Sequence, residues 1–272
     1  MIVKISMLQY CLETLNLKTL DKQCEVLSRC GYDGIEIYGY ERILKDPSET
    51  RKTLSKFGLK CSSIGGDYSV NSGHDLVNKD EKIRKNCLSY VSRCMEFASQ
   101  IGCSIVTLLV SPWGKPKPDI PVEKAWEYAL QGLKWLSDKA DEIGVYIAIE
   151  PLNRYETFMV NTLDEAIRLC KEAGGKRLGV MGDIFHMCIE EESLVKAIKS
   201  SGKLLLEMHM ANNTRKEIDK GFLNFSEILN ALKSIGFDGY LVGEFYPSKE
   251  NYENALRKYV SLMKESAGLV GT

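Results

Sequence analysis

The sequence has no long hydrophobic stretch and no paired cysteines, and each absence excludes a class of protein. Its longest apolar run, IVTLLV, has about six residues, whereas a membrane-spanning helix needs about 20. The N-terminus lacks the basic segment, apolar stretch and cleavage site of a signal peptide. The nine cysteines are scattered without a CxxC pair. We therefore expect a cytoplasmic protein with reduced, mostly buried thiols that neither spans nor binds a membrane.

The chain also lacks an excess of charge and the common nucleotide-binding motifs. Its formal net charge is −1, which removes the electrostatic basis for nucleic acid or an anionic membrane as the main partner. Neither a glycine-rich dinucleotide fingerprint nor a GxxxxGK phosphate loop occurs. The expected ligand is therefore a small molecule, and no nucleic acid partner is predicted.

What the sequence does contain is a repeated unit of amphipathic helix, glycine stop and short apolar strand. Seven joints of this kind occur, and an opening strand in IVKISMLQY makes eight. Glycine just past a helix end accepts the left-handed backbone that caps it. Strands that alternate with helices form a parallel sheet, and eight units favour closure into a barrel. The length of 272 residues suits one such domain. The predicted fold is α/β, a single (β/α)8 TIM barrel over residues 1–272.

Four residues of metal-ligand type stand at the ends of consecutive apolar runs in the second half of the chain. The runs VYIAIE, RLGVMGD, LLLEMH and YLVGE end on or near Glu150, Asp183, His209 and Glu244. In a parallel barrel all strand carboxyl ends open onto one face, so these side chains can converge. A single acid at a strand end is often only a helix cap, but four in succession predict a site. Three carboxylates and one imidazole suit a hard divalent ion such as Mn²⁺ or Mg²⁺.

Four further residues are candidates for substrate contacts, and each has a simpler alternative. Glu156 lies in the loop after the first of these strands, where it could instead pair with Arg154. His186 could grip a substrate oxygen beside the metal or serve as a hydrogen-bonded structural residue. Arg215 could donate two parallel hydrogen bonds to substrate or remain solvated. Trp113, in SPWGKPKPD, could stack on a sugar ring or pack in the interior.

The segments IEPLNRYETFMVNT, GDIFHMCIEE and FDGYLVGEF resemble the ketose 3-epimerases, the D-tagatose and D-psicose 3-epimerase group of the xylose-isomerase-like barrels. The resemblance is most specific over about residues 121–246. It implies one bound Mn²⁺, with Co²⁺ or Mg²⁺ as alternatives, and a small sugar as the substrate. It also implies that the protein forms a homodimer or homotetramer. It also implies roles for individual residues: Glu150, Asp183, His209 and Glu244 as metal ligands, Glu150 and Glu244 as the groups that move the proton, and Glu156, His186, Arg215 and Trp113 as substrate contacts.

The chain departs from the family pattern beside this set. Met210, Ala211 and Asn212 follow His209 where the family shows HTGE, and Glu244 lacks the proline that follows it in MEPF. A pocket carboxylate is thereby lost, and Asn212 is expected in the altered wall. The reaction type is better supported by the resemblance than the identity of the sugar.

The chemistry of the candidate residues agrees with inversion of C3 of a ketose through an enediolate. A divalent ion that holds the carbonyl and the neighbouring hydroxyl stabilises the developing charge. Inversion needs a base on each face, and two glutamates from different strands supply them. An aldose–ketose isomerase, a dehydratase or a lyase acting on a keto sugar or sugar phosphate could use the same metal site. A non-catalytic sugar-binding barrel is a further alternative.

Two further alternatives depend on histidine and lysine. An endonuclease-type member of the same barrel class needs a histidine-rich multi-zinc site, and this chain has only His74, His186 and His209. Lys115 and Lys117, in the loop that carries Trp113, could meet the phosphate of a phosphorylated substrate. The alternative is that they are ordinary surface lysines.

Overall fold

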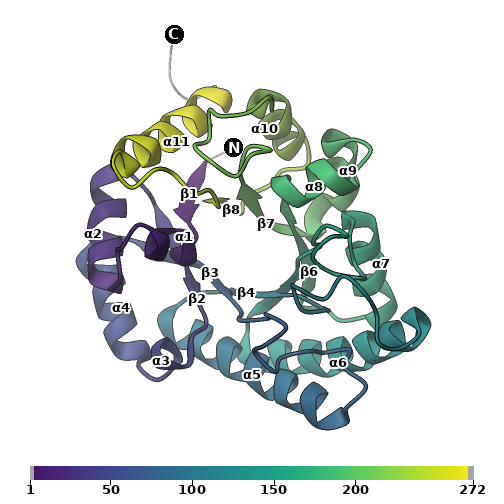
Figure 1. Cartoon of the computed structure of the whole chain (residues 1–272). Coiled ribbons are helices and arrows are strands. Elements are labelled where there is room, and N and C mark those ends of the chain that lie inside the picture. The colour runs from purple at the N-terminus through teal and green to yellow at the C-terminus, as the bar shows by residue number, and fades with distance from the viewer. Residues whose placement is uncertain (1–2, 269–272) are drawn as a thin grey trace.

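The computed structural model describes residues 3–268, and its centre is a ring of eight parallel strands (Figure 1). The strands are β1 (Lys4–Met7), β2 (Gly34–Tyr38), β3 (Lys60–Gly65), β4 (Ile105–Leu108), β5 (Tyr146–Ile149), β6 (Leu178–Asp183), β7 (Leu205–Met210) and β8 (Tyr240–Gly243). Their hydrogen-bonded order runs β1-β8-β7-β6-β5-β4-β3-β2. Between β1 and β2, Leu8 and Glu36 form a parallel bridge that brings the two ends of the sheet together. The predicted TIM barrel is confirmed.

Most of the helices form an outer circle around the ring, and the short helix α1 (Gln9–Thr14) lies inside that circle, next to β1 and β2 (Figure 1). The other helices are α2 (Leu20–Cys30), α3 (Glu41–Leu44), α4 (Pro47–Lys56), α5 (Glu81–Ile101), α6 (Val122–Ile143), α7 (Leu163–Ala173), α8 (Ile184–Glu190), α9 (Leu194–Ser201), α10 (Phe225–Ser234) and α11 (Tyr252–Ser266). A short 3₁₀ helix, Gly202–Leu204, leads from α9 into β7. The extra short helix α8 starts directly at the end of β6, so it brings its residues to the carboxyl end of the barrel.

In β2 and β7, alternation along the strand places apolar and polar side chains on opposite faces of the sheet. In β2, Ile35 and Ile37 are fully buried in the apolar layer between the sheet and the helices. Glu36 between them faces the barrel interior, because successive side chains of a strand point to opposite faces. The same alternation directs Glu207 and His209 of β7 inward together. β2 and β7 thus place two acids and an imidazole inside the barrel, while the layer outside the sheet is apolar.

The glycine joints end the helices as predicted. Gly144 caps α6 with a φ of 86°, and its N–H donates to the Ala140 carbonyl. A side chain here would strain the left-handed backbone, so glycine lets the chain turn directly into β5. Gly202 is the exception, because its φ of 52° and ψ of −130° leave the helical region and the 3₁₀ turn follows. Local backbone chemistry thus sets the barrel's repeat.

The cysteine and membrane predictions can also be compared with the structure. All nine cysteines are free thiols, and eight of them are buried. Burial raises the pKa of Cys24 and Cys170 to about 12, so these thiols stay protonated at neutral pH. Within residues 3–268, no helix combines the length and the apolar character needed to cross a bilayer.

Candidate active site

The four predicted metal ligands lie at the carboxyl ends of four adjacent strands. Glu150 directly follows β5, Asp183 ends β6, His209 is the second-last residue of β7, and Glu244 directly follows β8. Asp183 and His209 are partners in the β6–β7 ladder. The Glu244 N–H donates to the Met210 carbonyl at 3.1 Å and so extends the β7–β8 pairing by one step. Sheet hydrogen bonds therefore hold all four side chains over one opening of the barrel.

These four side chains form a cluster that fits a divalent cation. One ligand atom from each lies within 4.8 Å of the ligand atoms of the other three. Hard divalent ions bind oxygen at about 2.1 Å, which places ligand atoms on opposite sides of the ion about 4 Å apart. Three carboxylate oxygens with one imidazole nitrogen match the preference of Mn²⁺ or Mg²⁺ better than that of a thiolate-binding ion. The four residues could therefore hold one such ion with little rearrangement.

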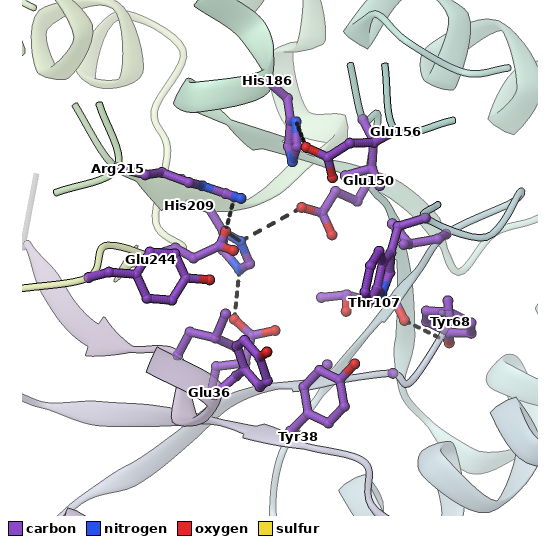
Figure 2. A pocket seen from close by; sticks show the side chains of 18 residues that line it. Glu36, Tyr38, Tyr68, Thr107, Glu150, Glu156, His186, His209, Arg215 and Glu244 are labelled. Carbon is purple, nitrogen blue, oxygen red and sulfur yellow. Dashed lines mark hydrogen bonds and ion pairs between the residues drawn. The ribbon is translucent and has the colours of Figure 1, made fainter. Parts of the chain in front are cut away.

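Two positively charged groups already compensate the acids of the cluster. The Nδ1 atom of His209 lies 2.8 Å from Glu244 Oε2 and 3.7 Å from Glu150 Oε1. The Arg215 guanidinium contacts Asp183 and lies 2.6 Å from Glu244 Oε2 (Figure 2). Arg215 itself adopts a left-handed φ of 51°, which is unusual for a side-chain-bearing residue. A strained backbone at this position directs a cation into the cluster.

The two glutamates of the cluster differ in proton affinity. Burial raises the pKa of Glu150 well above its usual value against the opposing effect of His209, and the neighbouring acids Glu244 and Asp183 add to the rise. Burial also opposes ionisation of Glu244, but Arg215 and His209 overcome it and hold the pKa of Glu244 below its usual range. The electrostatics of these side chains therefore favour a proton on Glu150 and a negative charge on Glu244.

His186 lies on α8 with its ring at the edge of the same cluster. The Asn153 backbone N–H, at 3.3 Å, and the Asn153 side-chain amide, at 2.7 Å, both face His186 Nδ1. Because a backbone N–H can only donate, Nδ1 is the acceptor and the proton sits on Nε2. That nitrogen lies 3.3 Å from Asp183 Oδ2. Burial lowers the pKa of His186, so a neutral ring presents its N–H to the pocket.

Glu156 is held beside His186 by the same asparagine. The Asn153 amide donates to Glu156 Oε1 at 2.9 Å. Arg154, the alternative partner, turns away from Glu156 and pairs with Glu190 at 2.8 Å. Glu156 therefore keeps an oxygen free at the pocket, consistent with the predicted place above the barrel (Figure 2).

The side chains surround a pocket of about 300 Å³, at the small end of the range for ligand sites. All eight predicted site residues except Asp183 line it. Asp183 lies just below, with no exposed surface. The remaining wall is mainly apolar and aromatic, formed by Leu8, Tyr10, Tyr38, Tyr68, Leu109, Trp113, Leu152 and Tyr246. The structure thus combines a charged floor with aromatic walls.

Trp113 is held at the pocket by the loops on either side of it. Its N–H donates to the Tyr68 carbonyl at 3.1 Å, and its carbonyl accepts from the Val70 N–H at 3.0 Å. On the other side, the Gly114 N–H donates to the Glu156 carbonyl at 2.9 Å. The Trp113 side chain is 46% exposed, so the alternative of an interior packing role is wrong. Loops after β3, β4 and β5 form one connected wall.

The family model described as "Xylose isomerase-like TIM barrel" matches residues 24–265. The chain belongs to this family. Among the relatives of this xylose isomerase-like barrel is the 3-dehydro-D-guloside 4-epimerase of Escherichia coli K12, 27% identical over 88% of this chain and 91% of the relative. The D-psicose 3-epimerase of Agrobacterium fabrum is 28% identical over 81% of this chain and 77% of the relative. Both names describe inversion of one carbon of a sugar.

Solved structures share the fold over nearly the whole chain. The D-psicose 3-epimerase of Clostridium cellulolyticum H10, crystallised with D-tagatose, superimposes with a TM-score of 0.88 at 21% identity and covers 97% of this chain and 99% of its own. The 3-keto-D-glucoside 4-epimerase of E. coli gives 0.86 at 24% identity, with coverage of 97% and 100%. At these identities the likeness supports the barrel alone.

Two expectations for the loops of this xylose isomerase-like barrel are wrong. Lys115 is not an ordinary surface lysine, because its side chain is only 13% exposed and its Nζ lies 2.9 Å from carboxylate oxygens of both Asp75 and Asp119, whereas Lys117 is exposed as expected. Asn212 is buried outside the pocket wall. Its amide donates to the Ile218 carbonyl at 2.8 Å, so it shapes the loop that carries Arg215. Lys115 is thus held by a residue distant in the sequence, Asp75, whereas Asn212 bonds within its own loop.

Sequence reasoning missed two acids inside the barrel. Glu36 lies 2.6 Å from His209 Nε2, and it is 1% exposed. Glu207 is fully buried, and neither of its oxygens has a hydrogen-bond partner among the described residues. Burial, reinforced by the charge of Glu36, raises the pKa of Glu207 to about 8. Each acid interrupts an apolar strand, in GIEIY and LLLEMH, and this lone charge was the signal that could have found them.

Proposed function

We propose that this chain is a divalent-metal-dependent sugar epimerase that inverts C3 of a ketose. The observation that carries the proposal is the placement of Glu150 and Glu244. They come from β5 and β8, face the pocket from different sides and each contribute an oxygen to the four-residue cluster (Figure 2). Inversion of a carbon needs a proton acceptor on one face and a proton donor on the other.

In the proposed cycle, one glutamate removes the proton at C3 and the other returns a proton to the opposite face. The carbon–hydrogen electron pair moves toward the adjacent carbonyl, whose oxygen gains negative charge, and the flow reverses when the second proton arrives. Which glutamate removes the proton depends on which of the two epimers is bound. Each acid would hold the ion through one oxygen and keep the other for the proton.

A divalent ion bound by Glu150, Asp183, His209 and Glu244 would supply a Lewis acid for the charge on the substrate oxygens. The donor set supports Mn²⁺, with Co²⁺ or Mg²⁺ as alternatives. The remaining polar residues have positioning roles in this proposal. His186 Nε2–H and the Arg215 guanidinium donate to substrate oxygens, Glu156 accepts from a hydroxyl, and Trp113 covers an apolar face of the sugar.

The proposed substrate is an uncharged sugar. Among the described residues that line the pocket, Arg215 is the one lysine or arginine, and its guanidinium is already paired with Asp183 and Glu244. Lys115 is paired elsewhere. A phosphate group would meet Glu150 and Glu156, and Arg215 would be the single lysine or arginine of the described lining to compensate its charge. We therefore expect free sugars to react in preference to their phosphates.

A second candidate function is inversion of C4 in a 3-keto-glycoside. The E. coli relative of which 91% of the length is matched is named a 3-dehydro-D-guloside 4-epimerase. The chemistry is analogous, because C4 is adjacent to a ketone at C3 in the same way that C3 of a ketose is adjacent to its ketone at C2. The exposed rings of Tyr10 and Trp113, 45% and 46% accessible at the pocket, would suit the second group of a glycoside. The same two glutamates would act on a shifted sugar ring.

One experiment separates these functions. The Mn²⁺-loaded protein is incubated in D₂O with free ketoses, 3-keto-glycosides and ketose phosphates, and NMR locates the deuterium in each product. Deuterium at C3 of a ketose together with the C3 epimer supports the first proposal. Deuterium at C4 of a 3-keto-glycoside supports the second. Deuterium at C1 together with an aldose product would identify an isomerase. A product that has lost water or a carbon fragment would identify a dehydratase or a lyase. If no sugar exchanges a proton, the protein would be a non-catalytic sugar-binding barrel.

Three expectations stay predictions: that the protein is cytoplasmic, that it forms a homodimer or homotetramer, and that residues 1–272 make up one domain.

A further inference from the structure

Glu36 faces the barrel interior through the regular alternation of β2, opposite an irregularity of the neighbouring strand. The β2–β3 register shifts beside Glu36: Ile35 pairs with Cys61 and Ile37 with Ile64, so the extra residue lies in β3. The Glu36 carboxylate also fits against Gly65 of β3, where an added Cβ would come within 2.8 Å of Glu36 Oε1. Two backbone features thus accommodate one buried acid.

The Glu36 carboxylate has one side-chain hydrogen bond within residues 3–268, and it is to His209. Its Oε2 atom lies 2.6 Å from His209 Nε2, and both residues are nearly inaccessible to solvent. A buried carboxylate without a partner is strongly unfavourable. The position of Glu36 is therefore tied to the orientation of one imidazole ring (Figure 2).

The two nitrogens of His209 face different groups. Nε2 faces Glu36, while Nδ1 faces Glu244 at 2.8 Å and Glu150 at 3.7 Å. An imidazole that binds a metal ion is neutral, with one N–H and one lone pair, whereas a charged imidazole donates from both nitrogens. An acceptor at Nε2 keeps the proton there, so the proton between Nδ1 and Glu244 is the one that an ion would replace. In metal sites, such a partner fixes the ring and raises the basicity of the ligand nitrogen.

We propose that Glu36 is a positioning residue that fixes the tautomer and ring orientation of His209 for metal binding. The inference rests on the metal site of the proposed function and extends it to a strand, β2, that contributes none of the four ligands. Glu36 acts through the imidazole and does not bind the ion. The cluster of Glu36, Glu207 and His209 also has ligand atoms within 4.8 Å of one another, so a second ion is the competing account.

Metal affinity of the full-length protein tests the proposal without an activity assay. Mn²⁺ is titrated into wild type, Glu36→Gln and Glu36→Leu, and the free ion is followed by its EPR signal. Loss of the hydrogen-bond acceptor of a metal-ligating histidine costs about 10–100-fold in metal affinity. We therefore expect Glu36→Leu to bind Mn²⁺ about 10–100-fold more weakly than wild type. The Gln variant should stay within a few fold of wild type, because its amide oxygen still accepts from Nε2–H.

Glu207→Gln and Glu207→Leu are the matched controls. Glu207 is equally buried and faces the same interior, but it has no hydrogen bond to His209. Both variants should retain the affinity of wild type. Melting temperatures of the metal-free proteins will separate a local effect from unfolding. With only three histidines in the chain, ¹⁵N-histidine spectra of the Mg²⁺-loaded protein should show the His209 proton on Nε2 in wild type and Glu36→Gln.

The outcomes are distinct. Equal affinity in wild type and Glu36→Leu would overturn the inference. So would a Gln variant as weak as the Leu variant, because that result would require the charge of Glu36 itself. Two Mn²⁺ ions per chain, one of them lost in the Glu207 variants, would assign Glu36 to a second ion. No Mn²⁺ binding by wild type would instead refute the metal site of the proposed function.

Discussion

The two halves of the barrel contribute different chemistry to one pocket. The strands and loops from β1 to β4 provide rings, namely Tyr10, Tyr38, Tyr68 and Trp113. The strands and loops from β5 to β8 provide the four-residue cluster with His186 and Arg215. A charged cluster requires fixed distances, whereas an aromatic wall tolerates small shifts of its ligand. The second half is therefore expected to set the reaction and the first half the choice of sugar.

Tyr246, after β8, and Glu36 are exceptions to this division. Glu36 is the one acid or base that the first half contributes to the described pocket lining, and it reaches across the barrel to His209 of β7. Glu36 shows how the halves are coupled: β2 supports the chemistry through a residue of the second half. Variants in the two halves can now test how far the division holds.

Metal removal should have the largest effect. Treatment with EDTA should abolish turnover, and Mn²⁺ or Co²⁺ should restore it, because charge develops on substrate oxygens during proton removal. Asp183→Asn and His209→Ala should each weaken Mn²⁺ binding, as measured by titration. Tyr38→Phe in the first half should bind Mn²⁺ like wild type. Full turnover in a preparation shown to be metal-free would contradict the mechanism.

Replacement of either active-site glutamate should have the second-largest effect on activity. Glu150→Gln and Glu244→Gln should each lower the rate of inversion by about 10²–10⁴-fold, the usual contribution of a positioned acid or base. If Mn²⁺ remains bound, the surviving glutamate should still exchange the C3 proton of unreacted ketose for deuterium in D₂O.

The control for these variants is Glu142→Gln on α6, a surface residue that pairs with Lys139 and should behave like wild type. Complete inversion at the normal rate in both active-site variants would show that the proton travels by other groups. Label only at C1 would favour an isomerase.

Arg215 and His186 should have a smaller effect. Arg215→Ala and His186→Ala should lower kcat/KM about 10–100-fold, since a hydrogen bond to a charged group contributes about 1.5–3 kcal/mol. Mn²⁺ should remain bound in both. Arg215→Lys is the matched variant, because it keeps the charge but loses the planar pair of donors. Normal kinetics in both alanine variants would return the two residues to structural roles.

The division between the halves also explains what the sequence could predict. Strands and helix ends depend on local periodicity and glycine, so the joints such as Gly144 could be identified directly. The four cluster residues could be identified because each is a lone ligand-type residue at a strand end. Nothing comparable marks the first half, where a tyrosine such as Tyr38 is equally typical of a core.

Long-range partners account for the remaining differences. Lys115 pairs with Asp75, 40 residues earlier in the chain, and no local pattern indicates such a contact. Glu36 pairs with His209, 173 residues later. The lone charge in GIEIY marks Glu36 as unusual, but its partner and the loop paths follow from tertiary packing, which a single sequence read by local pattern does not contain.

The smallest effect is expected in the aromatic wall, where Trp113 tests the role of the first half. Trp113→Ala should raise KM about 2–10-fold, with kcat nearly unchanged, because an aromatic contact contributes about 0.5–1.5 kcal/mol beyond burial. Trp135→Ala is a suitable control: its ring on α6 is 47% exposed, against 46% for Trp113, but lies outside the pocket. Steady-state kinetics with several ketoses and keto-glycosides should show a loss that differs between substrates in Trp113→Ala. A uniform fall in kcat would mean that the aromatic wall takes part in the chemistry, and the two halves would then share one role.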